Sequence, residues 1–425
     1  MSMSRKNKNL TLPLELVENS IDFLYADPKT LRSACLVSRA WVPICRAYIF
    51  RRIILHWCDD GARRSNSLYA LLLKTPSLAN YIRELSVHEG LISSEYSQIT
   101  FCFAQSQSLP KLLHRLPRLR LFEFRASALT HWCELGAELD YAVLQIAKCP
   151  TLDELILGSW NFSSQPKALD AMLEAATKNV KALALTDIVT SVVPEDYSIT
   201  TIQAPAARVP SAREHHRSQS LAVKSLSVDD GEASFVPFCA RWLHGRPSAI
   251  RSLHLSCSTN QSSISNLLWV IGESLEHFEL DIRALHGDGY LDLRRNTRLQ
   301  SLHIQASEHP LMSVGSNRSI PWIVDVLSTL CSFEHLELLV ISFGVNADRL
   351  RRLSQTDWDY WCRLDQILSQ RRYSRLCTVK IGIKFHCHNG SGYIEEARRI
   401  MSGLLDAGIL DIYTETRQYC CMDYY

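Results

Sequence analysis

Residues 250–280 read IRSLHLSCSTNQSSISNLLWVIGESLEHFEL, and this stretch holds one strand–helix unit and the start of the next. Ile250 is followed at +3 and +5 by Leu253 and Leu255, which alternate as in a strand with one buried face. An apolar stripe at helix spacing comes next, formed by Ile264, Leu267, Leu268 and Ile271. A second triplet begins at Leu275. The stretch therefore predicts a strand, a helix and another strand in succession.

The same apolar triplet recurs along the chain after residue 58. Its copies begin at Ile82, Leu119, Leu152, Val180, Val223, Ile250, Leu275, Leu299, Phe333 and Leu376. Further helical stripes lie between triplets, at Leu169, Met172, Leu173 and Ala176, and at Ile323, Val326, Leu327 and Leu330. One strand–helix pair cannot bury its apolar face alone, so neighbouring pairs must stack into a curved parallel sheet with helices outside. We expect residues 58–425 to form an α/β solenoid that resembles an irregular leucine-rich-repeat horseshoe.

The repeat pattern is irregular. The triplets are unevenly spaced, and the Asn or Cys that usually follows such a strand motif is mostly absent. An ordinary α/β domain is the alternative. Near 191–220, Pro, Ser and charged residues without periodicity predict a flexible loop. A last helical stripe that ends at Leu404, followed by Leu410 and Ile412, is expected to close the exposed end of the array.

The first part of the chain has a different pattern. Residues 1–10 form a basic polar tail that we expect to be flexible, and residues 11–57 show short helical patterns without strand alternation. Pro13 suits a first helical turn, Asp27 before Pro28 is a cap-and-start signal for a second helix, and Ser38 can cap a third. Such a three-helix module is too small to bury all its apolar residues, which predicts a need for a partner or for the following domain.

Residues 12–55, LPLELVENSIDFLYADPKTLRSACLVSRAWVPICRAYIFRRIIL, resemble the F-box, particularly the form common in fungal F-box-like proteins. Three submotifs occur in the expected order: Leu-Pro-x-Glu-Leu, Asp-Pro-x-Thr-Leu and Leu-Val-Ser-Arg-x-Trp. The resemblance implies that several residues lie at or behind the face that docks the adaptor subunit of a cullin-RING ubiquitin ligase. These residues are Leu12, Pro13, Leu16, Ile21, Leu31, Leu36, Val37 and Trp41. The alternative is a helical cap that seals the first repeat.

A second interaction surface follows from strand alternation in the repeats. If the last two residues of each triplet face the core, the residue between them faces the open, concave side of the sheet. This column comprises Ser227, His254, Glu279, His303, Glu337 and Lys380. In register, these side chains would form a lateral polar row able to bind a target protein. The alternative is a merely solvated face.

Composition excludes several other function classes. The 46 basic and 44 acidic side chains nearly cancel, so there is no global field that would attract nucleic acid or an anionic membrane. The fourteen cysteines contain no C-x-x-C pair, and several in apolar helical patterns, such as Cys35, Cys45 and Cys331, are expected to be buried thiols. The start of the sequence lacks the apolar core of a signal peptide, so we expect a cytoplasmic or nuclear protein.

The sequence contains no phosphate-binding glycine motif, nucleophile elbow or zinc-protease helix. His386, Cys387 and His388 are adjacent, so on a strand they would point to opposite faces, and no second pair has zinc-site spacing. We therefore expect no enzymatic activity, no cofactor and no metal. The expected role is a substrate receptor of an SCF-type cullin-RING E3 ubiquitin ligase, bound to the cullin through the adaptor. The alternatives are a repeat scaffold whose helices act as a cap or serve a non-proteolytic complex and, less favoured, an enzyme.

Overall fold

The structure is a computed structural model. It describes residues 14–25, 27–57, 61–89, 106–190, 221–230, 235–257, 261–282, 291–306, 319–345, 355–385 and 391–415. The predicted tail at 1–10, the predicted loop near 191–220 and the His386–His388 triplet lie outside these residues. The chain divides into two compact units. The first comprises Met1–Ser127 and Glu134–Asp153, and the second comprises Ala128–Cys133 and Glu154–Tyr425.

The first unit begins with three short helices: α1 (Leu14–Asp22), α2 (Pro28–Val37) and α3 (Trp41–Ile49). The predicted start of α2 is confirmed, because the Asp27 carboxylate accepts hydrogen bonds from the Lys29 and Thr30 amides. The helices share a small core of their own, formed by Val17, Ile21, Leu31, Ala34 and Cys45. The helical stripes seen in the sequence therefore pack against one another.

The remaining elements up to residue 147 alternate strand and helix. They are β1 (Arg52–Trp57), α4 (Gly61–Lys74), η1 (Pro76–Asn80), β2 (Glu84–Glu89), α5 (Ser108–Leu113), β3 (Leu121–His131), η2 (Trp132–Leu135) and α6 (Ala137–Ala147). β1 pairs in parallel with β2, and β2 with β3. The boundary at residue 58 was therefore placed too late, since the strand pairing of the repeat region already begins at Arg52. The strand β1 was missed because its short apolar run, Ile53–Leu55, comes soon after α3 and is not separated from it by the spacing of a full repeat.

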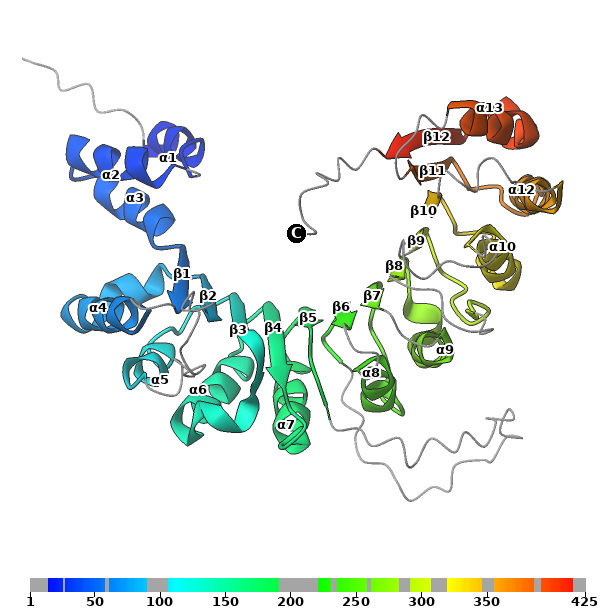
Figure 1. Cartoon of the computed structure of the whole chain (residues 1–425). Helices are drawn as coiled ribbons and strands as arrows, with labels where there is room; N and C mark the ends of the chain where they lie inside the picture. Colours follow the sequence, from blue (N-terminus) through cyan, green and yellow to red (C-terminus); the bar gives the residue numbers. More distant parts are fainter. Residues whose placement is uncertain are drawn as a thin grey trace, which may run out of the picture. The chain divides into compact units, whose positions relative to one another are not determined.

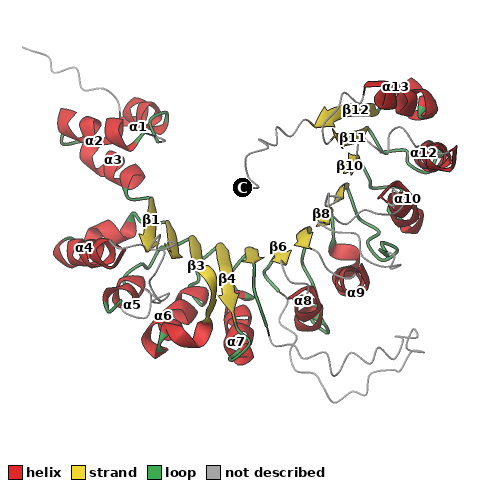
Figure 2. Ribbon diagram, viewed as in Figure 1, coloured by secondary structure: helices red, strands yellow, loops and turns green. Residues whose placement is uncertain are grey.

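The second unit continues the alternation (Figures 1 and 2). Its strands are β4 (Glu154–Asn161), β5 (Ala182–Thr186), β6 (Ser225–Asp230), β7 (Ser252–Cys257), β8 (His277–Ile282), β9 (Ser301–Ala306), β10 (Leu338–Val345), β11 (Thr378–Phe385) and β12 (Leu410–Glu415). Its helices are α7 (Pro166–Ala176), α8 (Phe235–Leu243), α9 (Gln261–Ile271), η4 (Gly272–Ser274), α10 (Ser319–Thr329), α12 (Gln355–Leu368), α13 (Ser391–Ile400) and α14 (Ser402–Asp406). Every strand from β4 to β11 pairs in parallel with the next strand in the chain.

This stacking of strand–helix pairs is a solenoid-like α/β fold. In the second unit the helices lie along one face of the strands, and we call the opposite face of the strands the open face (Figure 1). Residues alternate between the two sides: in β6, Leu226 and Val228 are buried while Ser225 and Ser227 are partly exposed. The predicted stripes of α7, α9 and α10 are all buried against the strands.

The predicted triplets coincide with the buried strand residues at every copy but one. For example, Leu253 and Leu255 pair in register with Phe278 and Leu280, and all four are buried. The exception is the copy expected to begin at Phe333. There the buried strand residues are Leu339 and Ile341, so this triplet begins at Leu336, three residues later than expected.

The cysteines are only partly as expected. Cys45 is buried and Cys35 is half-buried, but Cys331 is exposed. The correction has a simple cause, because α10 ends at Thr329 and Cys331 lies beyond its last turn.

Candidate protein-binding surfaces

The helical module of the first unit exposes large apolar side chains between Leu16 and Val37. Phe23 and Leu36 are each 89% exposed, Tyr25 is 69% exposed, Val37 is 67% exposed and Leu16 is 52% exposed. Leu36 and Val37 are the last two residues of α2, while Phe23 and Tyr25 lie in the turn after α1. The module thus has a buried core and, outside it, five exposed apolar side chains that we call together the apolar patch: Leu16, Phe23, Tyr25, Leu36 and Val37.

The structure separates the residues expected to contact the ligase adaptor into an exposed and a buried group. Leu16, Leu36 and Val37 are exposed, whereas Ile21 and Leu31 are each only 1% exposed and belong to the core of the module. Leu12 and Pro13 lie outside the described residues. The exposed group is free to contact a partner, and the buried group can only support it from behind.

Trp41 belongs to neither group. It is partly buried and packs against the core of the module together with Ile44 and Tyr48. A change at Trp41 would therefore disturb the packing of the helices as well as any surface they present.

The open face of the second unit carries the predicted polar row. Ser227 pairs in register with His254, His254 with Glu279, and Glu279 with His303. These four residues lie side by side on neighbouring strands, as strand alternation predicted. We call His254, Glu279 and His303 the His–Glu row.

A shared carboxylate links the three residues of the His–Glu row. The Nδ1 atom of His254 lies 3.1 Å from Oε2 of Glu279, and the Nδ1 atom of His303 lies 3.4 Å from Oε1 of the same carboxylate. All three side chains keep between 35% and 50% of their surface exposed. The carboxylate is therefore held between two imidazoles while the outer edges of all three groups stay available to a ligand.

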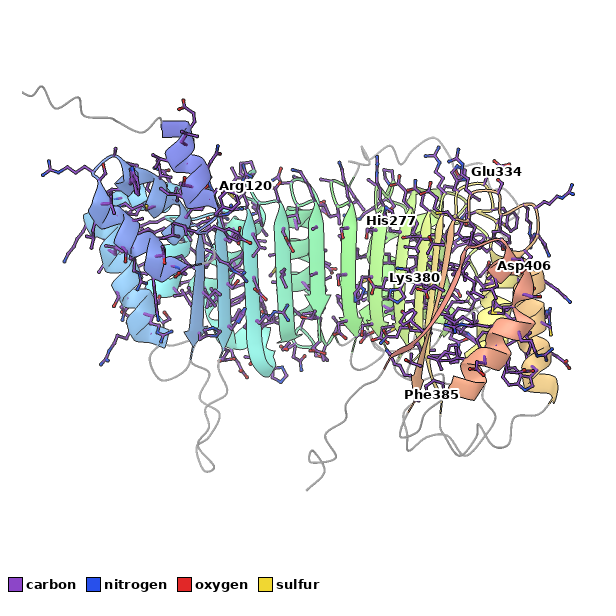
Figure 3. All side chains as sticks on the ribbon, turned by 90° about the horizontal axis from the view of Figure 1, so that it is seen from above. Arg120, His277, Glu334, Lys380, Phe385 and Asp406 are labelled. Carbon is purple, nitrogen blue, oxygen red and sulfur yellow. The ribbon has the colours of Figure 1, made fainter. Side chains whose placement is uncertain are left out.

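The prediction that Glu337 belongs to the polar row of the open face is wrong. His303 pairs in register with Val340, and Val340 pairs with Lys380. Glu337 precedes β10 and lies at the edge where the strands begin, because the triplet starts three residues later than expected. Lys380, which Figure 3 labels, does lie at its predicted position in the polar row. It is on β11 and pairs in register with Asp411 on β12.

The first unit contains a polar cluster that the sequence reading missed. Ser86 Oγ donates to Glu123 Oε2 at 2.7 Å, Arg125 Nε donates to Glu123 Oε1 at 2.5 Å, and His88 Nε2 lies 3.3 Å from Glu123 Oε2. Ser86 and Glu123 are the residues between the last two apolar positions of the triplets at Ile82 and Leu119. The rule that gave His254 and Glu279 would therefore have found them.

Burial and hydrogen bonds act in opposite directions on Glu123. Burial of this side chain, which is 12% exposed, raises its pKa, but hydrogen bonds from Ser86 and Arg125 and the nearby imidazole of His88 outweigh that effect. The net result is a pKa below the ordinary value of a glutamate. Glu123 is a charged group held by its neighbours, with no sign of a poised proton donor.

Within the described ranges, no group of three or more His, Cys, Asp or Glu side chains is arranged to hold a metal ion. None of the described helices has the length and apolar character needed to cross a membrane. No protein-family model matches this chain, and no curated protein matches it either.

Proposed function

We propose that this protein is a substrate receptor of an SCF-type cullin-RING E3 ubiquitin ligase. In this proposal the three N-terminal helices dock the ligase adaptor and, through it, the cullin, while the repeats hold a target protein. Other subunits transfer the ubiquitin. The receptor contributes effective concentration and orientation and needs no catalytic residue of its own.

The apolar patch is the observation that supports this proposal best. Burying one Leu, Val or Phe side chain is worth about 1.5–3 kcal/mol, so several such side chains left in water give up a large stabilisation. Several large apolar side chains exposed within one small module favour an interaction site. The apolar patch also lies within the residues that resemble an F-box. Leu36 and Val37 begin the third submotif of that resemblance, Leu-Val-Ser-Arg-x-Trp.

The test is co-purification of the full chain with the adaptor subunit of a cullin-RING ligase. A Leu36→Ser, Val37→Ser variant is expected to lose adaptor binding and keep its fold, since both side chains are exposed. Leu71→Ser with Leu73→Ser is the matched control, because these two leucines of α4 are also exposed but lie outside the module. Equal adaptor binding by the parent and the Leu36/Val37 variant would show that Leu36 and Val37 are not part of the docking face. Absence of binding by the parent would refute the ligase role.

We further propose that the target binds the open face of the second unit. The His–Glu row supports this, because both histidines and the glutamate retain exposed hydrogen-bonding edges. Replacing His254, Glu279 and His303 together by Ala should weaken target capture and leave adaptor binding unchanged. Glu396→Ala with Arg399→Ala, an exposed ion pair on α13, is the control. A target retained equally by the triple variant would place target recognition elsewhere.

A capping role is the second candidate function. Ile44, Ala47 and Tyr48 of α3 border the same pocket as Arg83 and Glu84, so the module packs close to the first strands. Under this alternative the parent chain would not bind the ligase adaptor. Deletion of the module would then lower the thermal stability of the repeats that follow.

A further inference from the structure

Three arginines stand at successive strand entries of the first unit. Arg51 immediately precedes β1, Arg83 precedes β2, and Arg120, labelled in Figure 3, precedes β3. Main-chain hydrogen bonds fix their spacing: the Arg83 amide donates to the Arg51 carbonyl at 2.9 Å, and the Arg120 amide donates to the Arg83 carbonyl at 2.7 Å. Neighbouring strands lie about 4.8 Å apart, so the three side chains start from adjacent positions on one edge.

These arginines are incompletely neutralised. Arg51 Nε lies 3.2 Å from Glu84 Oε1, and Arg83 Nη1 donates to the carbonyl of Arg118 at 3.2 Å. Within the described part of the chain, neither Arg83, Arg118 nor Arg120 forms an ion pair with a carboxylate. Burial lowers the pKa of Arg83, and the charges of Arg118, Arg120 and Arg51 lower it further. The fold therefore holds these four arginines close together despite the repulsion between their positive charges.

A pocket of about 470 Å³ lies against this cluster. That volume falls in the range of about 300–1,000 Å³ that is common for small-molecule sites. Arg51, Arg83 and Arg120 line it together with an apolar side formed by Ile44 and Ala47 of α3. The ring of Tyr81 adds an aromatic surface. The pocket therefore offers both a cationic and an apolar wall to one ligand.

The pocket has a net positive charge. Its lining carries three guanidinium groups and the carboxylates of Glu18 and Glu84, which leaves an excess of one positive charge. Arg118 adds a guanidinium beside Arg83, and Asp22 adds a carboxylate beside Tyr48, so these two neighbours leave the excess unchanged. The net charge therefore favours an anion. Guanidinium groups also match phosphate oxygens with two parallel hydrogen bonds.

We propose that this pocket binds a phosphate monoester that bears an aromatic or apolar substituent. The phosphate would lie against Arg83 and Arg120, and the substituent against Ile44, Ala47 and Tyr81. Arg51 is already paired with Glu84 and would contribute less. The proposal is independent of the ligase role, because it concerns a different surface from the apolar patch and the His–Glu row.

Isothermal titration of the full chain with phenyl phosphate tests the proposal. Phenyl phosphate should bind more tightly than inorganic phosphate, and phenol should not bind. Arg83→Gln with Arg120→Gln should weaken phenyl phosphate binding at least tenfold. Arg120→Gln alone, which breaks no side-chain hydrogen bond within the described residues, should weaken it by a smaller factor and guards against misfolding of the double variant.

The matched control is Lys224→Gln with Arg251→Gln. These residues immediately precede β6 and β7 of the second unit, so they occupy the same position relative to their strands as Arg83 and Arg120 do. The two substitutions remove as much positive charge as the Arg83/Arg120 pair of substitutions. The control should bind phenyl phosphate like the parent. Equal weakening by both double variants, or no binding of phenyl phosphate by the parent at millimolar concentration, would overturn the proposal.

The same chemistry exists in a free metabolite and in a phosphorylated side chain. A short peptide with one phosphotyrosine among Gly and Ala residues distinguishes these sources. Tighter binding of the peptide than of phenyl phosphate would support a phosphorylated protein as the natural ligand, and equal or weaker binding would support a free ester.

Discussion

At the scale of single residues, Glu123 shows how an open-face position becomes a supporting group. Its carboxylate is nearly buried and accepts hydrogen bonds from Ser86 and Arg125. A strand position that alternation assigns to solvent is therefore shielded by its own neighbours. Sequence patterning can find the position but cannot find this shielding, which depends on β2 and β3 being in register.

The low pKa of Glu123 predicts a pH effect on stability. A carboxyl group whose pKa is lower in the folded state stabilises that state above its unfolded pKa of about 4.3, and this contribution is lost as the pH falls through the folded pKa. Glu123→Gln should therefore flatten the acid limb of a plot of melting temperature against pH. At pH 7 it should lower the free energy of unfolding by about 1–2 kcal/mol. An unchanged acid limb would contradict the assignment.

The His–Glu row should contribute less to stability than Glu123 does. Its polar contacts are exposed, so Glu279→Ala should change the free energy of unfolding by less than about 1 kcal/mol. Urea denaturation of the parent and the variant measures this difference. A loss above about 2 kcal/mol would mean that the row supports the fold and is no mere binding surface.

At the scale of elements, the sequence predicted the strands because each triplet has few alternatives. The exception is instructive. Residues 333–343 read FEHLELLVISF, where apolar residues are so dense that triplets starting at Phe333 and at Leu336 both fit. Pairing of Leu302 with Leu339 and of Ile304 with Ile341 settles the choice, and pairing between strands cannot be read from a local pattern.

The start of α8 provides a test at this scale. Oδ2 of Asp230, at the end of β6, accepts hydrogen bonds from the amides of Phe235 and Val236 at 2.9 and 3.1 Å, and Asp230 is 1% exposed. Asp230→Ala would leave these buried amides without this acceptor. It should lower the free energy of unfolding by about 1–3 kcal/mol. Asp230→Asn keeps an oxygen acceptor and should lose less; equal losses in a urea titration would contradict the capping role.

At the scale of the whole molecule, the composition and periodicity predicted a stack of strand–helix pairs but not its division into two units. Nothing in the triplets marks a boundary near Asp153, because the triplet at Leu152 is as regular as its neighbours. The polar row of the second unit was predicted, except at Glu337. The arginine pocket of the first unit was not, because it gathers residues from α1, α3 and three strand entries that are distant in sequence.

A stacked array also predicts that damage stays local. Leu255→Ala removes a buried side chain from β7 and should cost about 2–5 kcal/mol. Because each repeat contacts mainly its neighbours, amide hydrogen exchange should accelerate more in β6–β8 than in β1–β2. Leu405→Ala, at an exposed position of α14, is the control and should change little. Uniform acceleration along the chain would show that it unfolds as a single cooperative body.

The strand entries have an evolutionary consequence. From Lys224 to Glu337 the carbonyl of each entry residue accepts the amides of the next entry, as the Lys224 carbonyl does from Arg251 and Ser252, so main-chain atoms join these positions whatever their side chains. Only Arg251 and Glu276 among these entries are also joined by a described ion pair, at 3.6 Å. Their side chains are then free to drift. Successive entries are occupied by Lys224, Arg251, Glu276, Gln300 and Glu337. Selection can therefore rewrite the charge along this edge, and with it the choice of ligand, at little risk to folding.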